Sequence, residues 1–261
     1  MPERKKVDAR GSVRVVTSNN FLRAAGLEKT SLKARKLLYI AMSQSKKTDT
    51  GFFEYAISAQ EFAKLMDTSV QNVYQDADTM TDELMKGFIK IDQRPEGKGF
   101  LKFSLFEECS YANATLTFKM SKDMTPILLG LKKDFSKPLL ADFLQMNSNY
   151  SIEIWHLMQQ YMHSAKPGIS DQLEFDISLD ELRRITGTEN KLKKVSQFKA
   201  RVLDQAIKEI SERCGVNITY DNLKTGRSVV GFHFIAKNVI HYDADAETLA
   251  KIEDFKRRNK V

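Results

Sequence analysis

The feature that most constrains the fold is a short helical pattern, a glycine-containing turn and a long helical pattern in direct succession. It occupies residues 179–211, which read LDELRRITGTENKLKKVSQFKARVLDQAIKEIS. This order is the sequence form of a helix-turn-helix, whose second helix lies in the major groove of DNA and reaches base edges with its first turns. Such a helix needs one face buried in a core and one face left free.

The long helix is predicted to have two contrasting faces. Its apolar side chains recur at helical spacing and predict one buried stripe: Phe198, Val202, Leu203, Ala206, Ile207 and Ile210. The opposite face is predicted to carry basic and amide side chains, with Asp204 as the single acid: Lys193, Lys194, Gln197, Arg201 and Lys208. This pattern suits a helix that binds duplex DNA, and a solvated surface helix shows it too.

A β-hairpin is predicted to follow the long helix. Two alternating runs rich in β-branched and aromatic residues, at 216–220 and 228–235, flank a polar turn that contains Lys224 and Arg227. A helix-turn-helix closed by a hairpin is a winged helix, and basic residues at its tip are expected over phosphates or a minor groove. A short strand is predicted just before Ser178, which is placed to cap the first helix.

Charge is unevenly distributed along the chain. The whole chain has a formal net charge of +7, and the segment 186–240 contains ten Lys and Arg against five Asp and Glu. Between residues 54 and 84, by contrast, there are seven acids and one base. A local excess of Lys and Arg over Asp and Glu indicates a nucleic-acid-binding face in the second half.

Composition excludes several classes of protein. A length of 261 residues with 42% hydrophobic residues permits two ordinary domains with real cores. No apolar run approaches the length of a membrane span, and no hydrophobic segment follows the charged start to form a secretory signal. With only Cys109 and Cys214, a disulfide framework is excluded, and reduced thiols in a cytoplasmic protein are expected.

The first half shows the same order of elements as the second. Glu61 follows Ser58 at the spacing of a capping box. The elements predicted there are a helix over residues 32–45, a strand over 52–57, a helix over 58–65, a helix ending near residue 84, strands over 88–91 and 100–105, and a strand over 115–120. The sequence therefore predicts an α+β fold with two tandem winged-helix domains.

The domain boundaries follow from this repeat of elements. We expect a disordered basic tail over residues 1–14, an N-terminal winged helix over 15–146, a C-terminal winged helix over 147–240 and a charged tail over 241–261. The C-terminal domain is expected to be the main DNA reader. The N-terminal domain is expected to dimerise and to make secondary DNA contacts.

The helix expected to read DNA in the first domain is acidic, which indicates contact with protein as well as DNA. It carries Asp76, Asp78, Asp82 and Glu83, which would repel phosphate unless they face away from it. The residues expected to make secondary DNA contacts are amide side chains on this helix and basic side chains on the hairpin that follows it: Gln71, Asn72, Gln75, Arg94, Lys98 and Lys102.

Four motifs in the second half resemble the tandem winged-helix plasmid replication initiators that bind iterons, the directly repeated sites of an origin. They are NYSIEIWHLMQQY at 149–161, ISLDELRRITG at 177–187, SQFKARVLDQAIKEI at 196–210 and KTGRSVVGFHF at 224–234. They resemble the opening helix, the first helix of the helix-turn-helix, the recognition helix and the closing hairpin of that family's second domain. The resemblance spans most of the chain, and the first half matches mainly in pattern.

The resemblance implies a function and a set of partners. It implies that monomers bind origin repeats in double-stranded DNA and help to open an adjacent AT-rich segment, while homodimers are inactive or repress their own gene. The host initiator, the replicative helicase and chaperones are the implied protein partners. No cofactor, metal or membrane is implied.

Carried onto this chain, the resemblance assigns two groups of DNA-contacting residues. The base-facing and groove-edge group is Lys193, Lys194, Gln197 and Arg201. Arginine or lysine suits guanine O6 and N7, and glutamine suits adenine N6 and N7. The phosphate-contacting group is Lys191, Lys199, Lys224 and Arg227. For Lys199, a surface position or pairing with Asp204 or Glu209 is an open alternative.

The sequence also bears on two other classes of function, a nuclease and a transcriptional repressor. A rolling-circle nuclease needs two histidines separated by one hydrophobic residue, and His156, His163, His233 and His241 show no such spacing. His156, on an amphipathic helix, and His233, in a strand, are expected to be ordinary packing residues. A phosphate-binding loop is also absent, so the chain is not expected to be an enzyme. A winged-helix transcriptional repressor without an initiator role remains an alternative, because it would use the same DNA-binding residues.

Overall fold

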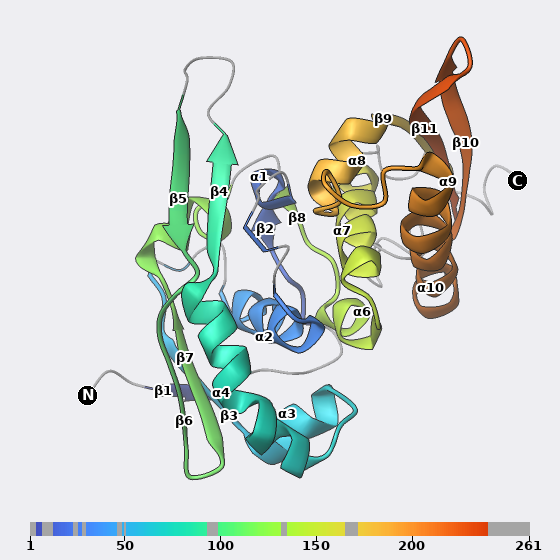
Figure 1. Ribbon diagram of the computed structural model, residues 1–261. Helices are drawn as coiled ribbons and strands as arrows, with labels where there is room; N and C mark the ends of the chain where they lie inside the picture. Colours follow the sequence, from blue (N-terminus) through green and yellow to red (C-terminus); the bar gives the residue numbers. More distant parts are fainter. Residues whose placement is uncertain are drawn as a thin grey trace, which may run out of the picture.

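The structure is a computed structural model in which two halves, each of mixed helix and strand, lie side by side (Figure 1). It describes residues 4–6, 13–22, 26–27, 30–45, 49, 51–92, 99–131, 135–164 and 172–239. The predicted α+β fold with two winged-helix units is confirmed. The expected tail over 241–261 lies outside the described residues. The expected disordered tail over 1–14 is wrong where it is described, because Arg4–Lys6 form a strand that pairs with Glu54–Ala56 and Arg14 forms a β-bridge with Leu139.

The first half contains the elements from β1 to α6. They are β1 (Arg4–Lys6), β2 (Thr17–Ser18), α1 (Asn19–Leu22), α2 (Leu32–Ser43), β3 (Glu54–Ser58), α3 (Ala59–Leu65), α4 (Val70–Lys86), β4 (Phe88–Asp92), β5 (Phe100–Ser104), β6 (Phe106–Ala112), β7 (Thr115–Met120), η1 (Lys122–Met124), α5 (Thr125–Leu128), β8 (Phe135–Ser136) and α6 (Leu140–Gln145). Helix α2 lies at the centre, and every side chain from Ala34 to Met42 is buried. The predicted capping box is confirmed, because the Ser58 and Glu61 side chains each accept from the other residue's backbone N–H.

The sheet of the first half differs from the expected one. Its strands lie in the order β1-β3-β7-β6, and β4 and β5 pair only with each other as a separate two-stranded ribbon. The hairpin that completes the winged helix is therefore β6–β7, which turns tightly at Asn113 and Ala114, both with positive φ. Strand β6 was not predicted, because its sequence FEECSYA lacks the apolar alternation of a half-buried strand.

The second half contains the elements from α7 to β11. They are α7 (Asn149–Ser164), β9 (Gln172–Ser178), α8 (Leu179–Ile185), α9 (Val195–Phe198), the π-helical turn η2 (Lys199–Leu203), α10 (Asp204–Cys214), β10 (Asn217–Thr225) and β11 (Ser228–Lys237). The three strands form an antiparallel sheet in the order β10-β11-β9. Ser178 caps α8 as predicted, since its hydroxyl accepts from the Glu181 N–H at 3.1 Å.

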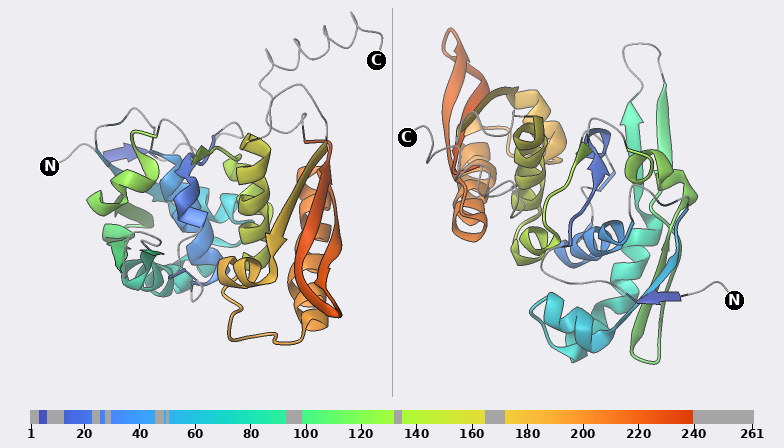
Figure 2. Two further views of the ribbon diagram at one scale, coloured as in Figure 1. Left: turned by 90° about the horizontal axis from the view of Figure 1, so that it is seen from above. Right: turned by 180° about the vertical axis from the view of Figure 1, so that it is seen from behind.

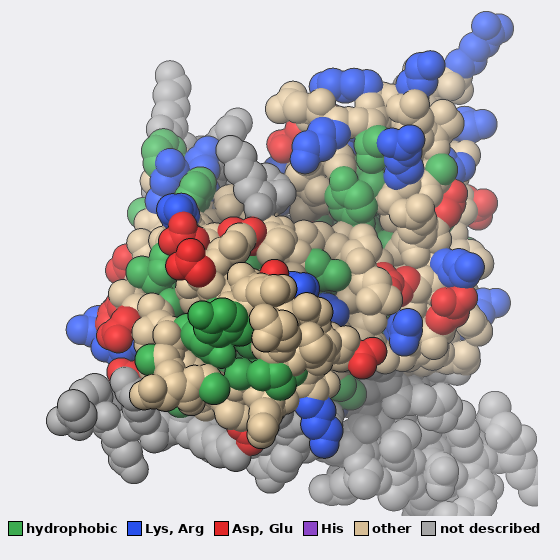
Figure 3. Space-filling model, turned by 60° about the horizontal axis from the view of Figure 1, so that its bottom comes forward, with side chains coloured by type: hydrophobic (Ala, Val, Ile, Leu, Met, Phe, Trp, Pro, Cys, Tyr) green, Lys and Arg blue, Asp and Glu red, His purple; other side chains and the backbone are tan. Residues whose placement is uncertain are grey.

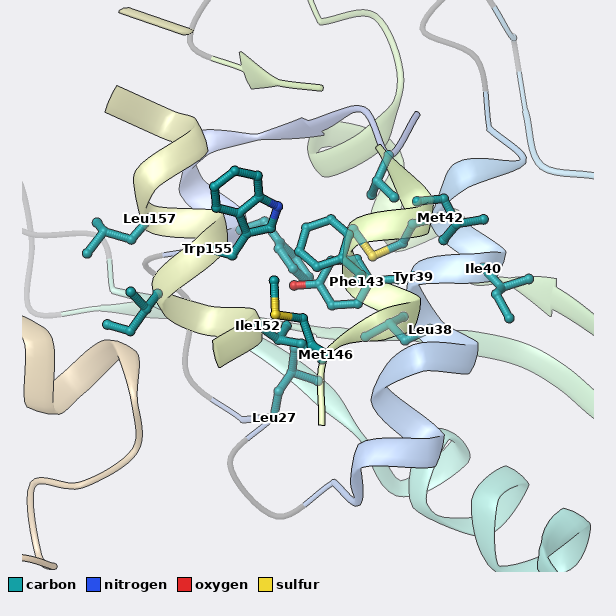
Figure 4. Close-up of a cluster of buried hydrophobic side chains, with 14 of the residues drawn as sticks. Leu27, Leu38, Tyr39, Ile40, Met42, Phe143, Met146, Ile152, Trp155 and Leu157 are labelled. Atoms are coloured by element: carbon teal, nitrogen blue, oxygen red, sulfur yellow. The ribbon is translucent and has the colours of Figure 1, made fainter. Parts of the chain in front are cut away.

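Helix α7 joins the two halves through a shared core. It contacts α1 and β8 on one side and α10 and β9 on the other. Its Trp155 is fully buried in a cluster that also holds Tyr39 of α2 and Phe143 of α6, whose rings stack 4.0 Å apart (Figure 4). The expected boundary at residue 147 falls between α6 and α7, but apolar packing continues across it.

An ion pair also links α7 to the first half. Arg35 of α2 is almost completely buried and pairs with Glu153 of α7. The same guanidinium donates to the hydroxyl of Thr30 and the carbonyl of Leu27. Because a buried charge is costly without such partners, this network fixes α7 against α2.

Candidate nucleic-acid interface

The long helix predicted to read DNA runs from Val195 to Cys214 through α9, η2 and α10. Its predicted apolar stripe is confirmed. Phe198, Val202, Leu203, Ala206 and Ile210 are buried, and Ile207 is half-buried. The i→i+5 hydrogen bonds of η2 widen the helix one turn after its start, a feature often found at functional sites.

Three lysines cluster in the turn that leads into this helix. Lys191, Lys193 and Lys194 are all exposed. Lys193 and Lys194 were expected on the helix itself, but the helix begins only at Val195, and Lys194 occupies the capping position without a side-chain cap. The two lysines therefore lie in the turn at the helix entrance, where the helix dipole favours a bound phosphate.

Gln197 and Arg201 form the exposed side of the first turns. Both side chains are exposed, and their spacing of four residues places them one above the other on one helix face. Further along, Lys208 pairs with Glu212 at 3.9 Å, so its charge is locally balanced. Gln197 and Arg201 are the side chains best placed to reach base edges.

Lys199 points toward the hairpin. Its ammonium donates to Oδ1 of Asn222 at 3.2 Å and lies 5.2 Å from the centre of the Tyr220 ring. Tyr220 in turn donates its hydroxyl hydrogen to Asp204 at 2.6 Å. These contacts brace the hairpin against the helix, and a phosphate contact by Lys199 stays a prediction.

The hairpin tip presents two free cations. Lys224 and Arg227 are exposed on either side of Gly226, whose φ of +59° favours glycine. In Figure 1 the β10–β11 hairpin rises beyond the rest of the second half, at the same end as the start of α9. The structure thus brings the tip and the helix entrance to one end of the domain.

Arg183 is a structural residue of this site that the sequence pattern does not reveal. It lies on α8 with 8% of its surface exposed, and its guanidinium faces the turn that carries the three lysines. The one available signal was its place beside Leu182, on the side of α8 that turns toward the core. Helical spacing alone does not distinguish such an arginine from its exposed neighbour Arg184.

The amides of the first half also lie at the surface. Gln71, Asn72 and Gln75 are exposed on the first turns of α4. In the left panel of Figure 2, α4 and the turn between α8 and α9 lie along the same side of the molecule. Helix α4 and this turn are therefore open to the same side of the molecule.

The acids of α4 are less repulsive toward phosphate than the sequence suggested. Asp76 pairs with Lys33 of α2, and Glu83 accepts the backbone N–H of Ser31 at 2.7 Å. Asp82 pairs with Lys86 on α4 itself. Much of the negative charge of α4 is therefore compensated by neighbouring groups.

The surface of the first half is nevertheless mixed in character. Figure 3 shows Lys and Arg side chains gathered over the second half, and acids with hydrophobic side chains over the first. Helix α4 contributes Val70 and Tyr74, which are 43% and 65% exposed.

The β4–β5 ribbon carries the remaining candidate cations. Lys102 is exposed, and its ammonium lies 4.9 Å from the centre of the Phe88 ring. Arg94 and Lys98 lie outside the described residues. The ribbon follows the C-terminal end of α4, whereas Gln71 is in the first turn, about 22 Å away along the helix axis. These two groups do not form one continuous site.

Among the described residues, no group of three or more His, Cys, Asp and Glu side chains could hold a metal ion. His156 is a core residue as expected: burial lowers its pKa to about 3, and Tyr39 and Ser136 hydrogen-bond its ring. His233 differs from the expected packing residue, because it lies on the outer face of the sheet and bonds Asp176 at 2.6 Å. That hydrogen bond raises the pKa of His233.

No described helix is long and apolar enough to cross a membrane.

This combination of helix-turn-helix, hairpin and localised cations defines a tandem winged-helix DNA-binding protein. Residues 14–159 match the family model described as Initiator Replication protein, WH1, and residues 178–236 match Initiator Rep protein, WH2. The chain belongs to this family of initiator replication proteins.

A solved structure shares the fold. It is the crystal structure of Pi initiator protein in complex with iteron DNA, with a TM-score of 0.73 and 19% sequence identity. The similarity covers 91% of this chain and 100% of that chain.

Proposed function

We propose that this chain is a plasmid replication initiator that binds directly repeated origin sites (iterons) in a sequence-specific manner. Both halves match the initiator family, and the similar Pi initiator protein was crystallised with iteron DNA. The observation that carries the proposal is the exposure of Gln197 and Arg201 on a helix whose other face is buried in the second winged helix. Side chains held this way can enter a major groove without disturbing the core.

The proposal divides the second-half residues by their positions. Gln197 and Arg201 read bases, and Lys193 and Lys194 contact the groove edge at the helix entrance. The exposed cations beyond the helix hold phosphates and set the register of the protein on DNA: Lys191, Lys224 and Arg227. Lys199 holds the hairpin in place in the free protein.

The first half makes secondary contacts in this proposal. Gln71, Asn72 and Gln75 face a neighbouring part of the duplex, and the β4–β5 ribbon adds Lys102 together with Arg94 and Lys98 from its connection. The compensated acids of α4 permit such an approach.

We further propose that the free protein is a cytoplasmic homodimer that represses its own gene, and that monomers bind the repeats. The support is the exposed apolar surface of α4, since exposed tyrosine and valine are typical of protein contacts. The host initiator, the replicative helicase and chaperones are the proposed partners, and no catalytic activity is proposed.

Light scattering of the full chain tests the proposed dimer. It should give the mass of a dimer in the absence of DNA, and the mass of one protomer per repeat on short duplexes. A monomer at all concentrations would contradict the dimer.

A binding titration tests the DNA-binding function. Fluorescently labelled duplexes carrying one repeat from the plasmid that encodes the chain are compared with duplexes of shuffled sequence at the same salt concentration. We expect an affinity at least about a thousandfold higher for the repeat. Equal affinities would contradict the proposal. A preference for an inverted repeat in a promoter over all direct repeats would instead indicate a repressor.

A further inference from the structure

The turn at the entrance of the recognition helix is built around one guanidinium group. Nη1 of Arg183 donates to the carbonyls of Thr188 at 3.2 Å and Lys191 at 3.0 Å. Nη2 donates to the carbonyls of Leu192 at 2.9 Å and Lys193 at 3.1 Å. All four N–H groups of the two terminal nitrogens are therefore directed at the backbone of a single turn.

The same group also contacts the recognition helix. The guanidinium carbon lies 5.0 Å from the centre of the fully buried Phe198 ring, so the cation packs on the first core side chain of the helix. Arg183 thus connects three parts of the motif, namely α8, the turn and the start of the long helix. Lysine has a single nitrogen and cannot span four carbonyls in this way.

This turn needs support, because its backbone is not in a low-energy regular conformation. Leu192 has a φ of +50°, which is uncommon for a bulky side chain. The carbonyls of the turn point inward to the guanidinium of Arg183. The side chains of Lys191, Lys193 and Lys194 lie on the outer side of the turn, and all three are exposed.

We propose that Arg183 is a positioning residue for DNA recognition, which fixes the lysine-bearing turn of residues 188–194 in its DNA-binding conformation before DNA is bound. This inference rests on the proposed function of the second winged helix. A turn that is already ordered loses little conformational entropy on binding, so more of the contact energy appears as affinity. Arg183 itself is buried and does not reach phosphate.

The charge of Arg183 is balanced without a carboxylate. Among the described residues, no acid forms an ion pair with it, and the four carbonyl dipoles take that role. Its neighbour Arg184 is different, because it pairs with Glu181 on the same helix at 2.6 Å and is partly exposed. Arg184→Gln therefore removes an equal charge from α8 and leaves the four hydrogen bonds of Arg183 to the turn in place, and is the matched control for Arg183→Gln.

The test combines DNA affinity with amide hydrogen exchange in the full-length chain. We expect Arg183→Gln to lower affinity for the repeat duplex at least about tenfold, since several backbone residues must then be ordered on binding. Exchange of the amides in residues 189–194 should become faster in the free protein and slow again on DNA. The slope of log affinity against log salt should stay unchanged, because no phosphate contact is lost. Arg184→Gln should change none of these three quantities appreciably.

Several results would overturn the inference. One is an unchanged exchange rate in residues 189–194 together with an affinity equal to that of Arg184→Gln. Another is a salt slope reduced by about one unit, which would reassign Arg183 to direct phosphate contact. If the unaltered chain did not prefer the repeat, the proposed function would fail, while the exchange data would still report whether Arg183 orders the turn.

A second variant guards against a loss of folding. If thermal melting shows that Arg183→Gln is unfolded, the same measurements are made on Arg183→Lys, which keeps the charge and the aliphatic stem. We then expect partial ordering of the turn and an intermediate affinity. Full affinity with unaltered exchange in Arg183→Lys would show that charge alone suffices, and would contradict the positioning role.

Discussion

At the scale of single residues, burial separates the side chains that build the recognition helix from those that can meet DNA. Phe198 and Val202 are fully buried, whereas Gln197 and Arg201, each one residue away along the chain, are exposed. Helical periodicity predicted this division because it is a local property of the sequence. The role of Arg183 was not predictable in this way, since its partners are carbonyls of a turn whose path is set by tertiary packing.

The base-reading residues give the first prediction. Arg201→Ala or Gln197→Ala should weaken binding to the repeat by about 1–3 kcal/mol and weaken binding to random DNA much less, because bidentate base contacts are lost. Fluorescence anisotropy on both duplexes measures the difference. Lys208→Ala is the control, since Lys208 already pairs with Glu212 on the same helix. Equal losses on both duplexes would mean that Arg201 and Gln197 contact phosphates.

A buried carboxyl group on α6 gives a prediction about pH. Burial raises the pKa of Asp142 to about 7, against weaker opposing effects of Trp155 and Arg14. Its Oδ2 has no hydrogen-bond partner among the described residues. Because the folded pKa lies above the unfolded value, the stability that this group contributes at low pH is lost as pH rises toward 7.

Asp142→Asn should remove this pH dependence. Relative to the unaltered chain, its free energy of unfolding should increase by roughly 2–3 kcal/mol between pH 5 and pH 8. Urea unfolding at both pH values measures the change. The comparison is made between variant and parent at each pH, so that effects of His156 cancel. A constant difference across this range would show that Asp142 is ionised throughout.

At the scale of elements, local pattern predicted the helices and most strands but not how the strands pair. The predicted hairpin of strands 88–91 and 100–105 is confirmed as β4 and β5, yet it forms a separate ribbon outside the main sheet. Strand β6, with its polar sequence, replaces it in the main sheet. Pairing of β6 with β7 is a local hairpin, but pairing of β3 with β7 joins strands that are distant in sequence, which single-strand patterns do not encode.

The hairpin of the second half gives a prediction about salt. Lys224→Ala and Arg227→Ala should each lower the slope of log affinity against log salt by about one unit, because each removes one phosphate contact. The loss should be similar for repeat and shuffled duplexes. Affinity titrations at four or more salt concentrations measure the slope. A Lys224→Ala variant that weakens only repeat binding would show that the hairpin reads sequence.

At the scale of the whole molecule, the two winged helices are joined by a shared core through α7. Two linked observations support this joint: Trp155 packs with side chains of α2 and α6, and Arg35 pairs with Glu153. The tandem arrangement could be predicted from the repeated order of elements. The joint could not, because Arg35 resembles any helix arginine until α7 is packed against it.

The ion pair between Arg35 of α2 and Glu153 of α7 gives a prediction about stability. Arg35→Met should lower the free energy of unfolding by about 3–5 kcal/mol, since the largely buried carboxylate of Glu153 then loses its ion pair with Arg35. Lys33→Met on the same helix breaks an exposed pair with Asp76 and should cost no more than about 1 kcal/mol. Urea unfolding of both variants measures the difference. Equal and small losses would mean that the Arg35–Glu153 pair does not hold the halves together.

The central claim is that the helix from Val195 to Cys214 reads bases in the major groove of the repeat. Methylation interference tests it most directly, because a methyl group on guanine N7 blocks arginine contact in that groove. We predict interference at guanines grouped on one groove face, with one of them becoming insensitive in Arg201→Ala. Interference unchanged by Arg201→Ala and by Gln197→Ala, or absent at every guanine of a repeat bound in preference to shuffled DNA, would contradict the account.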